Sequence, residues 1–127
     1  MARQALDEFY AMGVKPDWWK LPPFTTEEGW QEVERVINEH DPWCRGIVML
    51  GLNAPMSDLI ADFALGANSP VCKGFAVGRT LFQDAAEAWF AGDIGDEAVR
   101  DQVTVNYRNL LDAWQALRTS NETRRAS

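Results

Sequence analysis

Residues 45–52, RGIVMLGL, form a nearly continuous apolar run without regular polar alternation. Such a run is typical of a parallel strand that is covered on both faces. Two further stretches have the composition of strands, VKPDWWKL at residues 14–21, with Pro16 confined to its start, and VCKGFAVGR at residues 71–79. These three segments decide the fold, because every other apolar pattern in the chain has a helical period.

Helical periodicity predicts helices over residues 3–12, 25–40, 55–67 and 80–91 and from Asp96 onward. Thr25 and Glu28 have the spacing of a capping box at the start of the second helix. The buried positions of these helices are expected to include Leu6, Phe9, Tyr10, Trp30, Val33, Val36, Ile37, Leu59, Ile60, Phe63, Trp89, Val99, Val103, Tyr107, Leu110, Trp114 and Leu117.

The alternation of helices and strands implies right-handed crossovers and a parallel sheet with helices outside. We therefore expect an α/β fold in which residues 1–127 form one unit. Three parallel strands leave two open edges, which natural proteins usually cover or close. The chain is thus expected either to assemble with another copy or another protein, or to be the end of a larger barrel.

Composition excludes several classes of protein. Of the 127 residues, 46% are hydrophobic and 24% are charged, a globular balance, and the net charge is -7. An acidic chain has no bulk attraction for nucleic acid or for an anionic membrane. Cys44, Cys72 and a single His40 make no metal-ligand cluster, so we expect buried reduced thiols, no metal and no cofactor. No apolar run is long enough to cross a bilayer, and the predicted location is the cytoplasm.

Two loops after predicted strands have candidate binding residues. In VGRTLF, residues 77–82, Gly78 permits close backbone approach, a helix follows at once, and Arg79 supplies a positive charge. The N–H groups of such a helix start suit a phosphate dianion, although a tight turn with a solvated arginine fits the same letters. In MLGLNAP, residues 49–55, Gly51 ends the second strand, and Asn53 either caps the next helix or offers its amide to a ligand.

Lys20 is the candidate reactive amine. Strand alternation puts Trp18 and Lys20 on one face and Trp19 and Leu21 on the other. If the second face packs on helices, Lys20 points into the interior near the carboxyl end of its strand, beside Trp18 as a substrate contact. Desolvation there lowers a lysine pKa in the direction that a Schiff base requires. The alternative is a lysine that extends from the strand end to solvent.

The segments GVKPDWWKL (13–21), CRGIVMLGLNAP (44–55) and KGFAVGRTLF (73–82) together resemble the aldolase-like domain fused behind 5-dehydro-2-deoxygluconokinase in bacterial myo-inositol catabolism. That domain is similar to class I aldolases, which are (β/α)8 TIM barrels. The resemblance covers nearly the whole chain but only the last three strands of such a barrel. It therefore implies a partial TIM barrel, three parallel strands with flanking helices, in which residues 1–127 are the C-terminal part.

The resemblance also implies roles for individual residues. WWKLPP resembles the strand with the imine-forming lysine, which makes Lys20 catalytic, and AVGRTLF resembles the phosphate loop, which gives Gly78 and Arg79 that role with help from Gly51. Threonine at position 80 departs from the asparagine of that loop. The implied reaction is retro-aldol cleavage of 2-deoxy-5-keto-gluconate 6-phosphate. The strands that supply the acid/base carboxylate have no counterpart here, so we expect this chain alone to be a poor catalyst. The alternative is a non-catalytic module that binds a phosphorylated ligand or mediates oligomerisation beside a sugar kinase.

Overall fold

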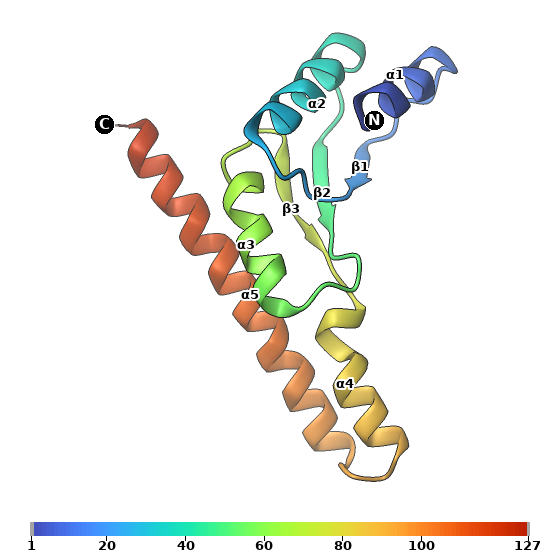
Figure 1. Ribbon diagram of the computed structural model, residues 1–127, viewed down its shortest axis with the longest axis vertical. Helices are drawn as coiled ribbons and strands as arrows, with labels where there is room; N and C mark the ends of the chain where they lie inside the picture. Colours follow the sequence, from blue (N-terminus) through green and yellow to red (C-terminus); the bar gives the residue numbers. More distant parts are fainter. Residues whose placement is uncertain (1, 127) are drawn as a thin grey trace.

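Helices and strands alternate along the chain (Figure 1), and the computed structural model describes residues 2–126. The elements are α1 (Ala2–Ala11), β1 (Trp18–Leu21), α2 (Glu27–His40), β2 (Gly46–Leu50), α3 (Met56–Gly66), β3 (Cys72–Ala76), α4 (Arg79–Phe90) and α5 (Asp96–Arg125). Each predicted helix and strand is present. The first strand begins later than predicted and ends at the predicted residue, and the other two are shorter than predicted at both ends. Among the described residues, no helix has both the length and the apolar character needed to cross a membrane.

The strands form a parallel sheet in the order β1-β2-β3. Lys20 pairs with Val48, and Val48 pairs in turn with Gly74. The register between β2 and β3 shifts at Ile47/Val48, where β3 has one additional residue. The α/β class with a parallel sheet is therefore confirmed, and the carboxyl ends of the strands lie at one edge.

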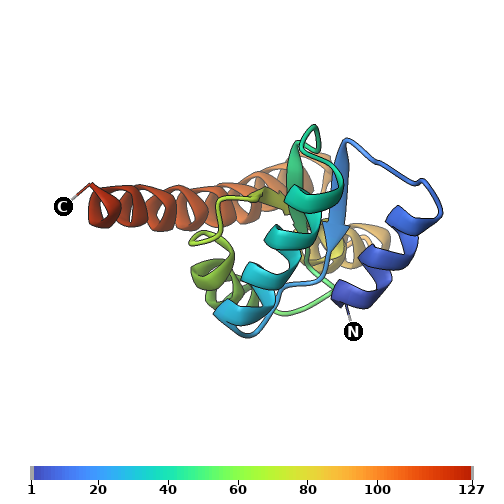
Figure 2. The same ribbon diagram turned by 90° about the horizontal axis from the view of Figure 1, so that it is seen from above.

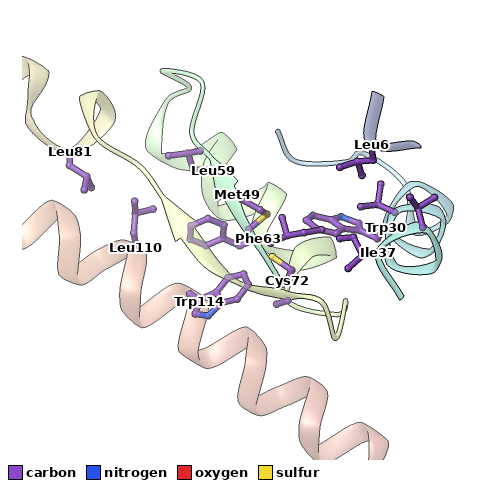
Figure 3. Packing of buried hydrophobic residues seen from close by; sticks show 14 of the residues in the cluster. Leu6, Trp30, Ile37, Met49, Leu59, Phe63, Cys72, Leu81, Leu110 and Trp114 are labelled. Carbon is purple, nitrogen blue, oxygen red and sulfur yellow. The ribbon is translucent and has the colours of Figure 1, made fainter. Parts of the chain in front are cut away.

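One face of the sheet is buried under helices. Figure 2 shows α1, α2 and α3 gathered on one side of the strands. Phe63 of α3 lies at the centre of the core in Figure 3, stacked 4.9 Å from Phe75 of β3 and 5.5 Å from Trp114 of α5. Ile47 and Met49 of β2 are buried on this face. The alternation that directs Trp19 and Leu21 toward the helices is thus observed, because both are partly buried against this core.

The opposite face of the sheet is open. Trp18 and Lys20 are exposed there, and Val48, Leu50 and Gly74 are only partly buried. The prediction that residues 45–52 are covered on both faces is therefore wrong for the described chain, since Ile47 and Met49 are buried while Val48 and Leu50 are only partly buried. An apolar run indicates that both faces of a strand are apolar. It does not show whether the residues that cover the second face belong to the same chain segment.

Helix α5 is held to the sheet by its buried face and by Arg118. The Arg118 guanidinium donates to the carbonyl oxygens of Ala67 and Ser69, both at 3.3 Å, and of Cys72 at 3.4 Å. About two turns further along the helix, Arg125 donates to the carbonyl oxygen of Asn68. These bonds tie the last turns of α5 to the segment between α3 and β3, so the basic end of the helix is anchored.

Several expected core positions are more exposed than predicted. Trp89 is 41% exposed, because the hairpin of α4 and α5 extends beyond the sheet (Figure 1), and Tyr107 and Phe9 are also largely exposed. Partial exposure is also found at Ile60, Val99, Val103 and Leu117. The capping box predicted for Thr25 and Glu28 is wrong. Thr26 is the N-cap residue, its side chain accepts the hydrogen bond from the backbone N–H of Gly29, and a glycine has no side chain to complete a capping box.

Gly46 is expected to be essential at the start of β2. Its φ is +132°, and an added Cβ would lie 2.4 Å from the backbone oxygen of Val71, which cannot move away freely. Gly46→Ala should therefore lower the free energy of unfolding by about 2 to 3 kcal/mol. Urea titration followed by circular dichroism measures this change.

Gly74→Ala is the matched control in the neighbouring strand. A Cβ at Gly74 meets no atom within 4 Å. Its unfolding free energy should stay within about 0.5 kcal/mol of the parent chain. Equal losses in the two variants would contradict the close approach of β2 to Val71.

Candidate functional site

A hollow of about 300 Å³ lies where β2 and β3 end. It is lined by the segments that follow the two strands, namely residues 50–53 and 76–80, together with Phe82. Gly51, Asn53, Gly78 and Arg79 are all among the lining residues, so four of the predicted binding residues come together. Carboxyl ends of parallel strands are the usual place for ligands in open α/β sheets.

Gly51 allows the two loops to approach each other. A Cβ at this position would lie 3.0 Å and 3.1 Å from the two methyl carbons of Val77. At position 78 an added Cβ would lie 3.3 Å from the Phe82 ring, so the second glycine also relieves crowding. The fold thus gives a steric reason for glycine at positions 51 and 78, both of which were predicted as binding residues from the sequence.

The loop after β2 is a tight turn with unusual backbone angles. Leu52 and Asn53 have φ values of 48° and 63°, and the Ala54 N–H donates to the Gly51 carbonyl oxygen at 2.9 Å. Consecutive positive φ values closed by this bond are the pattern of a type I′ turn. Asn53 is not the cap of α3, because Pro55 occupies the N-cap position and no side chain caps the helix. The capping alternative for Asn53 is therefore wrong.

The start of α4 gives the hollow its positive potential. Gly78 is the N-cap residue, and no side chain makes a capping hydrogen bond to the first turn. The helix dipole and its free N–H groups therefore face the end of the sheet. Among the described residues that line the hollow, only Arg79 is charged. The arrangement can hold an anion through backbone N–H groups and one guanidinium.

Lys20 and Trp18 lie outside this hollow, on the open face of the sheet. Lys20 is level with Val48 and Gly74 across the strands, and Trp18 is level with Gly46. From strand spacings, the Cα atoms of Lys20 and Gly78 are roughly 15 Å apart. Lys20 is exposed, so the described residues do not supply the desolvation expected for it. Trp18 is 43% exposed and lies farther from the carboxyl end than Lys20 does.

Leu52 and Thr80 line the hollow and Ala54 adjoins it, and the sequence had predicted a site role for none of the three. The Thr80 hydroxyl donates to the Ala54 carbonyl oxygen at 2.8 Å and so joins the two loops. Asparagine after a strand-ending glycine is a signal for left-handed backbone, and it would have located the turn. No local signal indicates a bond between residues 26 positions apart.

The cysteines are poor candidates for nucleophiles. Both are free, with Cys72 buried and Cys44 half-buried, so full burial is confirmed for Cys72 alone. Burial raises the pKa of Cys72 from 9.0 to about 11, and burial also raises the pKa of Cys44. Thiolate is the reactive form, so both are protonated at neutral pH. Among residues 2–126, no group of three or more His, Cys, Asp or Glu side chains is arranged to hold a metal ion.

Comparison with protein families matches residues 1–118 to a family described as "Uncharacterized protein conserved in bacteria (DUF2090)". The chain belongs to this family. No curated protein and no solved structure matches it. The match begins at residue 1 and includes every residue that lines the hollow of this DUF2090 chain, as well as Lys20.

The stability of the DUF2090 chain should fall in alkaline solution because of Cys72. Its thiol loses a proton near pH 9.0 when unfolded and near pH 11 when folded, so the unfolded state binds fewer protons between these values. The free energy of unfolding should therefore decrease from pH 9 to pH 11, at no more than about 1.4 kcal/mol per pH unit.

Urea titrations at several pH values, compared with Cys72→Val, measure this contribution. The variant removes the thiol and keeps a similar apolar volume, so the other titrating groups are shared by both proteins. Its stability should decline less steeply than that of the parent. Parallel declines would contradict the buried, protonated thiol.

Proposed function

We propose that this chain is part of a class I aldolase that cleaves 2-deoxy-5-keto-gluconate 6-phosphate. The observation that supports this most is the hollow at the carboxyl ends of β2 and β3, where Gly51, Gly78 and Arg79 meet at an uncapped helix start. Lys20 lies on the open face of the same sheet. The resemblance of the three strand segments to aldolase-like domains gives these positions their proposed roles.

In this proposal the hollow holds the substrate phosphate. The backbone N–H groups at the start of α4 donate to its oxygens, and Arg79 neutralises its charge. Asn53 is available for a substrate hydroxyl because its amide is not used to cap α3. Leu50, Leu52, Val77 and Phe82 give the hollow apolar walls beside these polar groups. The keto group adjoins the phosphate in this substrate, so Lys20 must extend along the open face toward the strand ends.

Lys20 would supply the electron sink. Its neutral amine adds to the C5 ketone, the hydroxyl of the resulting carbinolamine takes up a proton, and loss of water gives an iminium ion. The C3 hydroxyl then gives up its proton to a base as the C3–C4 bond breaks. The electron pair of that bond enters the iminium and forms an enamine, and malonate semialdehyde leaves. Protonation at C4 and hydrolysis release dihydroxyacetone phosphate and restore the amine.

The open face supports a barrel that is completed by other residues. Parallel sheets are normally buried on both faces, and here Lys20 and Trp18 are exposed on one of them. Covering this face with an N-terminal barrel half, or with a further copy of the chain, would shield Lys20 from water, as the proposed imine chemistry requires. It would also bring the proton-transfer base, since no carboxylate is among the described residues that line the hollow. We place this assembly in the cytoplasm, where free thiols stay reduced.

The second candidate function is a non-catalytic module that binds a phosphorylated ligand or mediates oligomerisation. The exposure of Lys20 favours it, because an amine on the open face has none of the enclosed apolar surroundings that activate a Schiff-base lysine. In this case the hollow binds a phosphate ester, and the open sheet face serves assembly.

Reductive trapping separates the two functions. With dihydroxyacetone phosphate and sodium cyanoborohydride, an aldolase lysine forms an imine that is reduced to a stable secondary amine. With the open face of the sheet covered, as in the assembled barrel, we expect peptide mass spectrometry to find the adduct mainly on Lys20, and the yield to fall at least about tenfold in Lys20→Met. Lys15→Met is the matched control, because Lys15 is also exposed but precedes β1. Equal labelling of Lys15 and Lys20 would leave the module as the better description.

Arg79→Gln should weaken phosphate binding at the hollow. Loss of a charge-assisted contact should raise the dissociation constant for dihydroxyacetone phosphate about tenfold. Isothermal titration calorimetry measures it. Arg45→Gln is the matched control, because Arg45 is exposed and precedes β2 at the other end of the sheet. Equal weakening in both variants would indicate general charge attraction and would exclude the proposed phosphate position.

A further inference from the structure

Thr80 connects the two loops of the hollow. It is the second residue of α4, and its hydroxyl donates to the Ala54 carbonyl oxygen at 2.8 Å. Ala54 lies between the turn after β2 and the start of α3. The bond is partly buried, so solvent competes with it less than with a surface contact. The start of α4 and the turn after β2 are thereby kept in register.

The turn that Thr80 holds is one that needs support. Leu52 and Asn53 both have positive φ, a region that costs a residue with a Cβ roughly 1 to 2 kcal/mol. Leucine has no side-chain polar group to compensate for this. Strained backbone of this kind persists where surrounding contacts determine it. Here the Ala54 N–H closes the turn on Gly51, and the Ala54 carbonyl is bound by Thr80, so both backbone polar groups of one residue are used.

The Thr80 hydroxyl is not free to donate to a ligand. A hydroxyl has one proton, and this proton is directed to the Ala54 carbonyl oxygen. Thr80 would otherwise be the natural donor to an anion, because it lies in the first turn of α4 and lines the hollow. Its effect on a ligand is therefore exerted through the position of the turn.

We propose that Thr80 is a positioning residue, whose hydrogen bond to Ala54 holds the Gly51–Ala54 turn in its left-handed conformation and so shapes the anion site against α4. This inference rests on the proposed phosphate position. It predicts that the hydroxyl is required and that the extra methyl group of threonine is not. It also predicts that loss of the hydroxyl loosens the turn in the absence of any ligand.

The test compares Thr80→Val with Thr80→Ser. Valine keeps the shape and removes the hydroxyl, and serine keeps the hydroxyl. In Thr80→Val we expect amide hydrogen exchange at residues 51–54 to become about fivefold faster, the factor that corresponds to loss of one neutral hydrogen bond. The dissociation constant for dihydroxyacetone phosphate, measured by calorimetry, should rise by a similar factor. Thr80→Ser should return both values to within about twofold of the parent.

Thr104→Val is the matched control. The Thr104 hydroxyl also donates to a backbone carbonyl at 2.8 Å, that of Arg100, but it lies on the exposed surface of α5. We expect this variant to leave exchange at residues 51–54 and ligand affinity unchanged. Urea titration of all three variants shows whether each is folded under the conditions of the assay.

The possible outcomes separate this inference from the function proposed above. If the parent chain does not bind dihydroxyacetone phosphate, the phosphate position is wrong, and faster exchange in Thr80→Val alone still supports the role of Thr80 in the turn. If the parent binds and Thr80→Val shows unchanged exchange and affinity, the positioning role is overturned. Weakened binding in both Thr80→Val and Thr80→Ser, with unchanged exchange, would overturn it as well.

Discussion

Burial of one face of a three-stranded parallel sheet is the constraint on which the rest of this structure depends. Phe63 of α3 contacts Phe75 of β3 and Trp114 of α5, so a single side chain joins a strand to two helices. Arg118 adds hydrogen bonds from α5 to the segment between α3 and β3. These contacts set the direction of the strands and hence the edge at which their carboxyl ends meet.

The candidate site follows from that arrangement. Because β2 and β3 are parallel neighbours, the segments after them emerge side by side, and Gly51 lets them come into contact. The start of α4 then faces the strained turn at Leu52 and Asn53, and Arg79 adds a positive charge. Anion binding needs no further group here, whereas covalent chemistry at Lys20 needs a cover over the open face. Binding and catalysis thus make different demands on the same sheet.

Local sequence pattern was sufficient to predict the helices and strands and four of the residues that line the hollow, namely Gly51, Asn53, Gly78 and Arg79. The apolar runs and helical periods located every strand and helix, and a glycine after each of two strands located the hollow. The same reasoning was wrong where exposure depends on distant residues. Trp89 has the spacing of a core residue, but the α4–α5 hairpin leaves it exposed. Asn53 is of a residue type that often caps helices, but it lies in a left-handed turn that ends before α3 begins.

The sequence by itself determined the order of the elements, the parallel sheet and the face to which Lys20 belongs, because these follow from periods of two and of 3.6 residues. Only the tertiary structure decided that this face is open, that Thr80 bonds to Ala54, and that Lys20 lies apart from the hollow. Each of these depends on which distant segments come into contact. The periodicity of one segment does not show which other segment packs against it.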